Sequence, residues 1–135
     1  MKALRFVVTL MALLLVLTSA YRAQQASDAS AQVALRAAIK IETIDGNLKG
    51  AIEVYAKIVA QYPNSRRVAA EALARMAGCY EHLGAAQADE ARKVYERIVR
   101  EFSDQTALVA QAQARLSALP LSHHRGLTTP PDGGT

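Results

Sequence analysis

Apolar residues recur every three or four positions through most of the chain, from about residue 30 to residue 119. This spacing places them on one face of an α-helix. No run of β-branched residues alternates with polar ones, so the pattern predicts an all-α fold. Turn-forming residues divide it into five predicted helices, which cover residues 30–44, 48–62, 66–83, 89–102 and 105–119.

The breaks between these helices have the residues that turns require. Gly46 and Gly84 each follow a helix, and glycine tolerates the left-handed backbone of such turns. Pro63 ends the second helix because proline has no amide hydrogen for a continuing helix. Pro120 ends the last helix, and residues 120–135 are rich in Pro, Gly, Ser and Thr. We predict that this segment is a disordered tail.

The first twenty residues have the three-part pattern of a secretory signal peptide. Lys2 and Arg5 precede an uncharged apolar run over residues 6–17, and small residues follow up to Ala20. The run is short for a membrane-spanning helix, which needs about 20 apolar residues. We therefore predict a signal peptide over residues 1–20 and export to the periplasm or cell envelope.

Two alternatives for the leader stay open. Cleavage could follow Ala23 or Ala26, or the leader could remain as an N-terminal membrane anchor with the rest of the chain facing the periplasm. The polar residues 21–29 are predicted to form a short disordered lead. The folded domain is then predicted to span residues 30–119.

Composition and charge narrow the class of activity. The 135 residues have a formal net charge of +4, which falls to about +2 without the two basic residues of the leader. Such a balance gives no footprint for nucleic acid. No Ser-centred, Gly-rich or metal-spaced motif occurs, so we predict no enzymatic activity, no cofactor and no metal site. His123 and His124 lie in the predicted tail, where we interpret them as solvated, with weak metal binding as the alternative.

One segment of the chain is repeated forty residues later. Residues 51–63 read AIEVYAKIVAQYP, and residues 91–103 read ARKVYERIVREFS, with a shared skeleton of Ala, Val-Tyr and Ile-Val. The alignment continues into the next helices, where Ala74 and Arg75 match Ala114 and Arg115. Self-similarity across a helix pair indicates a helical array, in which each hairpin buries one face on the next.

These residues resemble the tetratricopeptide repeat. Its characteristic positions are occupied, in chain order, by Gly46, Ala51, Tyr55, Pro63, Leu73, Tyr80, Gly84, Ala91 and Tyr95. The resemblance implies an α-solenoid of helical hairpins, with two repeats and a capping helix. Small residues such as Ala51 allow two helices to approach closely, and an aromatic one turn later fills the gap toward the next helix.

The chain departs from the family pattern in two ways. The period of the family is about 34 residues, whereas Gly46 and Gly84 are 38 residues apart and Ala51 and Ala91 are 40 apart. The first opening helix also has Glu42 where the consensus aromatic would lie. The extended helices and the leader together resemble the repeats of bacterial envelope proteins.

The resemblance implies that the chain binds other proteins in a groove lined by the first helix of each unit. The candidate groove residues are Arg36, Lys40, Ala74, Gly78 and Glu81. Arg36 and Lys40 are one helical turn apart and could meet a carboxylate of an extended peptide; an ordinary exposed charged face is the alternative. Ala74 and Gly78 leave room for a partner backbone, although small residues also allow close helix packing.

We therefore expect a non-catalytic scaffold or adaptor of the bacterial cell envelope that binds a protein or peptide partner. One alternative is a structural protein that self-associates through its unfinished repeats, as a homo-oligomer. The other is a regulatory front module separated from a larger exported polypeptide. Contact with a membrane is expected only through an uncleaved leader.

Overall fold

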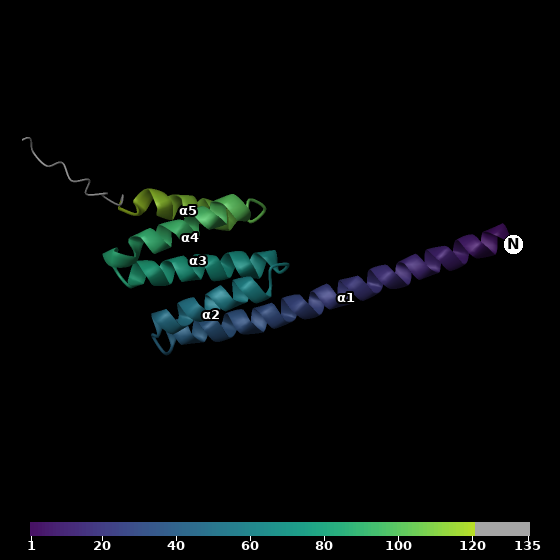
Figure 1. Cartoon of the computed structure of the whole chain (residues 1–135), viewed down its shortest axis with the longest axis horizontal. Coiled ribbons are helices and arrows are strands. Elements are labelled where there is room, and N and C mark those ends of the chain that lie inside the picture. Colours follow the sequence, from purple (N-terminus) through teal and green to yellow (C-terminus); the bar gives the residue numbers. More distant parts are fainter. Residues whose placement is uncertain (121–135) are drawn as a thin grey trace, which may run out of the picture.

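The computed structural model describes residues 1–120, which form five α-helices and one 3-10 turn with no strand among them (Figure 1). The elements are α1 (Lys2–Thr43), α2 (Leu48–Gln61), α3 (Arg66–His82), η1 (Ala85–Gln87), α4 (Ala88–Glu101) and α5 (Thr106–Ala118). The prediction of an all-α fold with five helices is therefore confirmed. The predicted tail after Pro120, with His123 and His124, lies outside the described residues.

Helix α1 is much longer than the sequence pattern predicted. Residues 21–29, expected to be a disordered lead, are helical and continuous with the rest of α1, so that expectation is wrong. No glycine or proline precedes Gly46, and nothing in this stretch interrupts the helical hydrogen bonds. Asp28 also accepts a hydrogen bond from the hydroxyl of Ser65, which attaches this part of α1 to the turn before α3.

The N-terminal part of α1 extends away from the other helices and exposes its apolar side chains (Figure 1). Among the described residues, this is the one helix that is long and apolar enough to cross a membrane. Such a helix near the N-terminus fits both a signal sequence and a membrane anchor.

The helices pack as two antiparallel hairpins and a final single helix (Figure 1). Helices α1 and α2 form the first hairpin, α3 and α4 the second, and α5 packs mainly against α4. Gly46 and Gly84, at the turns within the hairpins, have φ angles of 63° and 104°. These values lie in the left-handed region, which costs glycine little because it has no Cβ atom.

Part of the core consists of residues at which the two units correspond. The fully buried Ala51 and Ala91 let α2 and α4 approach their neighbours closely, and Tyr55 and Tyr95 are buried one turn later. Leu73, from the middle of α3, is also completely buried between the two hairpins. Two other repeat positions are less enclosed: Tyr80 is half-buried, and Pro63 is exposed in the turn directly after α2.

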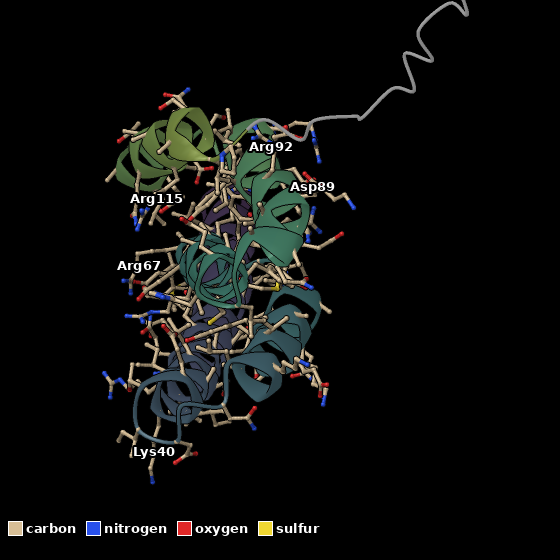
Figure 2. All side chains as sticks on the ribbon, turned by 90° about the vertical axis from the view of Figure 1, so that its left-hand side faces the viewer. Lys40, Arg67, Asp89, Arg92 and Arg115 are labelled. Carbon is tan, nitrogen blue, oxygen red and sulfur yellow. The ribbon has the colours of Figure 1, made fainter. Side chains whose placement is uncertain are left out.

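The helices form two layers. Helix α3 contacts both α1 and α5, whereas α2 and α4 do not contact each other within the described chain. Figure 2 shows α1, α3 and α5 on one side and α2 and α4 on the other. Among the described helices, neighbouring ones contact each other in the layer of α1, α3 and α5 but not in the layer of α2 and α4. The array therefore curves toward α1, α3 and α5. We call these three helices the inner layer and α2 and α4 the outer layer.

Candidate partner-binding groove

A cavity of about 380 Å³ opens on the inner layer between α1, α3 and α5. Its lining includes Glu42, Ala74, Arg75, Gly78, Leu108 and Arg115. We call this cavity the groove. Its lining residues lie as far apart in the sequence as Glu42 and Arg115, so only the packing of the repeats creates it.

The floor of the groove is formed by small residues of α3. Ala74 and Gly78 are one helical turn apart, and both line the cavity. A Cβ atom added to Gly78 would meet no atom within 4 Å. The glycine is therefore not required for close packing of helices, and the space above it is open to a partner.

One wall of the groove is built around Glu42 of α1. The hydroxyl of Tyr55 in α2 donates a hydrogen bond to Glu42 Oε2, and Arg75 Nη1 in α3 lies 3.5 Å from the same oxygen. Burial, and secondly the bond to Glu42, raise the pKa of Tyr55 well above its ordinary value, so the hydroxyl keeps its proton. The three side chains connect three successive helices.

The same arrangement recurs one repeat later. The hydroxyl of Tyr95 in α4 donates to Glu81 in α3, and Arg115 Nη1 in α5 lies 3.7 Å from Glu81 Oε2. Burial and then the bond to Glu81 raise the pKa of Tyr95. We refer to the two sets, Glu42–Tyr55–Arg75 and Glu81–Tyr95–Arg115, as the Glu–Tyr–Arg triads.

The triads correct the alignment of the two units. Alignment of the two units on Gly46 and Gly84 matches Glu42 with Tyr80, the position of the consensus aromatic. The hydrogen bonds in the structure instead make Glu42 equivalent to Glu81. The difference is one residue, because Gly46 follows Glu42 by four positions and Gly84 follows Glu81 by three. The repeated segment already matched the tyrosines and the arginines of the two triads. The signal for the glutamates was an acidic residue at a similar distance before each tyrosine.

The structure brings some of the predicted groove residues together and separates others. Ala74 and Gly78 line the groove. Glu81 is not part of the lining, but it contacts two lining residues, Tyr95 and Arg115. Arg36 and Lys40 are exposed on α1, and Figure 2 shows Lys40 pointing away from α3 and α5.

The position of Lys40 follows from helix geometry. Lys40 is about 200° around α1 from the residue two positions earlier, at about 100° per residue. That residue, Ala38, is fully buried and marks the side of α1 that faces the core. Spacing along α1 relates Arg36 to Lys40 correctly, but it does not show which side of the helix meets α3.

Comparison with known proteins identifies the repeat. Two family models, each described as tetratricopeptide repeat, match the chain, one over residues 43–120 and the other over residues 13–65. The chain belongs to the tetratricopeptide repeat family. No curated protein and no solved structure matches it. Tetratricopeptide repeats generally mediate protein–protein interaction and are typically non-catalytic, so a groove on the inner layer of this repeat protein is its candidate binding site.

A second polar connection holds the tetratricopeptide array at its other edge. The guanidinium of Arg66, at the start of α3, bonds both carboxylate oxygens of Asp104 before α5, with Nε at 3.1 Å from each. It also lies over the ring of Phe102, 5.0 Å from the centroid. The bond to Arg66 is the main cause that holds the pKa of Asp104 well below its usual range. The Arg66 side chain therefore links the start of α3 to the turn before α5.

Proposed function

We propose that the protein is a non-catalytic scaffold or adaptor of the bacterial cell envelope, and that its groove binds a segment of a partner protein. The open floor at Gly78, on the curved inner layer of a tetratricopeptide array, is the observation that carries the proposal. Partner backbones approach such a surface closely where side chains are small. The flanking charged and half-exposed apolar side chains supply contacts on both sides of the floor.

Export is proposed from the N-terminal part of the chain. The charged start and exposed apolar side chains of α1 support delivery to the periplasm or cell envelope, with the chain either cleaved after Ala20 or anchored by its leader. N-terminal sequencing of the protein isolated from fractionated cells distinguishes the two forms. A cytoplasmic protein with an intact N-terminus would contradict both.

The binding proposal is tested by filling the groove. Gly78→Leu directs a side chain into the groove from a Cβ position that meets no atom within 4 Å, so we expect a folded protein that loses its partner in affinity capture from envelope extracts. Ala56→Leu is the matched control, because Ala56 is exposed on α2 in the outer layer. Partners captured equally by the wild type and by Gly78→Leu would exclude the groove as the binding site.

Self-association is the second candidate function. Val33 on α1 and Ile44, directly after this helix, are 67% and 72% exposed, which gives this end of the array an apolar surface for a second copy. Light scattering over a range of concentrations tests this candidate. A monomer at every concentration would eliminate it.

A further inference from the structure

The acidic and basic side chains of the inner layer differ in how far they reach into solvent. The side chains of Glu42 and Glu81 are 19% and 22% exposed, whereas that of Arg115 is 54% exposed. Glu71, which also lines the groove, and Arg75, whose Nε lies 3.7 Å from it, are both 34% exposed. A partner that approaches the groove along α5 therefore meets the guanidinium of Arg115 before it meets the carboxylates of Glu42 and Glu81. The net charge of the chain does not reveal this difference.

The triads explain why the carboxylates lie deep. Each glutamate accepts a hydrogen bond from a buried tyrosine on the outer layer, which draws its side chain between the layers. The arginine approaches the same carboxylate from the next inner helix and leaves part of its guanidinium free for another acceptor. Tyr55 and Tyr95 thereby hold the carboxylates of Glu42 and Glu81 below the surface. Arg115 remains at the surface of the groove, and Arg75 is half-buried beside it.

A further exposed cation extends this surface along α3. Arg67 is exposed at the start of the helix and lines a smaller cavity of about 240 Å³ next to α1. Its neighbour Arg66 is bound to Asp104, but no ion pair engages Arg67 among the described residues. Figure 2 shows Arg67 and Arg115 on the same side of the molecule, opposite to Asp89 and Arg92 of the outer layer.

We infer that the inner layer selects an acidic segment of its partner protein, with Arg67, Arg75 and Arg115 as contact residues. Tyr95 and Glu81 act as positioning residues for Arg115. This inference rests on the proposed function and specifies the chemistry of the partner. Charge complementarity raises the association rate and excludes basic competitors as well as adding affinity.

The repeat geometry adds a spacing to this inference. Packed helices such as α3 and α5 have axes about 8–10 Å apart, and an extended peptide rises about 3.3 Å per residue. Two carboxylates on such a peptide reach neighbouring inner helices when they are about three residues apart. An acidic residue at every third position is therefore the pattern that fits Arg75 and Arg115.

The test measures binding of three labelled peptides to the full chain in dodecyl maltoside by fluorescence anisotropy. They are repeats of Ala-Ala-Glu, Ala-Ala-Gln and Ala-Ala-Lys of equal length. We expect the Glu peptide to bind about tenfold more tightly than the Gln peptide, and its affinity to fall as salt is raised from about 50 to about 500 mM. Equal binding of the Glu and Gln peptides would overturn the inference.

Charge-reversed variants locate the site. Arg115→Glu is expected to weaken binding of the Glu peptide about tenfold, and the matched control Arg100→Glu, on the outer layer, by less than about twofold. Tyr95→Phe keeps the ring but releases Glu81, so it should weaken the Glu peptide while leaving the Gln peptide unchanged. Equal effects of Arg115→Glu and Arg100→Glu would show a non-specific charge effect and refute the assignment.

The inference and the proposed function can fail separately. If Gly78→Leu abolishes capture of a partner while the Glu peptide shows no preference, the groove binds protein but the acidic chemistry is wrong. If Gly78→Leu leaves capture intact, the proposed function itself fails. Binding to phosphatidylglycerol vesicles with no binding of the Glu peptide would mean that the exposed arginines serve a lipid surface, which also contradicts the inference.

Discussion

Helices α3 and α5 occupy equivalent places in successive repeats, but they differ in what surrounds them. Helix α3 packs against α1, α2, α4 and α5, whereas α5, among the helices of residues 1–120, packs only against α3 and α4. Their sequences follow this difference. The completely buried Leu73 and Ala77 of α3 correspond to Gln113 and Ser117 of α5, which are exposed.

The side of α5 that faces inward is unchanged. Ala112 of α5 is 1% exposed, and its counterpart in α3, Ala72, is 0% exposed, so both are buried. The helix therefore keeps the apolar surface that packs on α4, and it replaces the surface that would receive another outer helix with polar residues. This is the pattern of a terminal repeat, which must be soluble on one face. The comparison of α3 and α5 shows that the residues on one surface of the helix distinguish a helix in the middle of an array from a terminal one.

The largest difference is expected between alanine substitutions at the equivalent positions 73 and 113. Leu73→Ala leaves a cavity at the junction of the two hairpins and should lower the free energy of unfolding by about 2–5 kcal/mol. Gln113→Ala removes no buried contact and should change it by less than about 0.5 kcal/mol. Urea denaturation of both variants measures the difference. Similar values for the two would mean that α5 is as enclosed as α3.

The next effect compares the two triads. Tyr55→Phe and Tyr95→Phe each remove a hydrogen bond to a carboxylate, which should cost about 1–3 kcal/mol of unfolding free energy. We expect the larger loss at Tyr55, since Arg75 is less exposed than Arg115, with side chains 34% and 54% exposed. The same urea experiment gives both values. A larger loss at Tyr95 would contradict the view that the α5 end is the more solvated one.

A smaller and opposite effect is expected when α3 is made more like α5. Position 78 is glycine in α3, and the equivalent position 118 is alanine in α5. Gly78→Ala should raise the free energy of unfolding by about 0.5–1 kcal/mol, because alanine loses less backbone entropy and its Cβ meets nothing. Gly50→Ala is the contrasting control. Its Cβ would lie 2.5 Å from Asn47 Nδ2, so this variant should disturb the cap of α2 and destabilise the protein.

The smallest effect concerns the exposed link from α3 to the start of α5. The Arg66 guanidinium lowers the pKa of Asp104, so the pair contributes stability above the unfolded-state pKa of about 3.9. That contribution is lost as the pH falls through the lower pKa of the folded state. Arg66→Ala should therefore lower the urea midpoint slightly at pH 7 and by less at the acid end, where only its contacts with groups that do not titrate, such as the Phe102 ring, are lost. A variant that loses more stability in acid than at neutral pH would contradict the assigned sign.

Much of the fold was readable from the sequence. The three-to-four spacing of apolar residues fixes five helices, since burial of one face is the main source of helix stability in a protein. Glycine at the two hairpin turns and the segment repeated at residue 91 predicted a tetratricopeptide array, which is confirmed. The candidate floor of the groove, Ala74 and Gly78, was also predicted from the repeat.

The sequence determined these features because each depends on neighbours within a few turns of helix. Only the tertiary structure decided what depends on contacts between helices. It placed Glu42 with Tyr55 and Arg75 instead of in the consensus aromatic position, and it turned Lys40 away from the groove. A one-residue difference in turn length, and the rotation of α1 against α3, are set by packing across the array, and no local pattern records them.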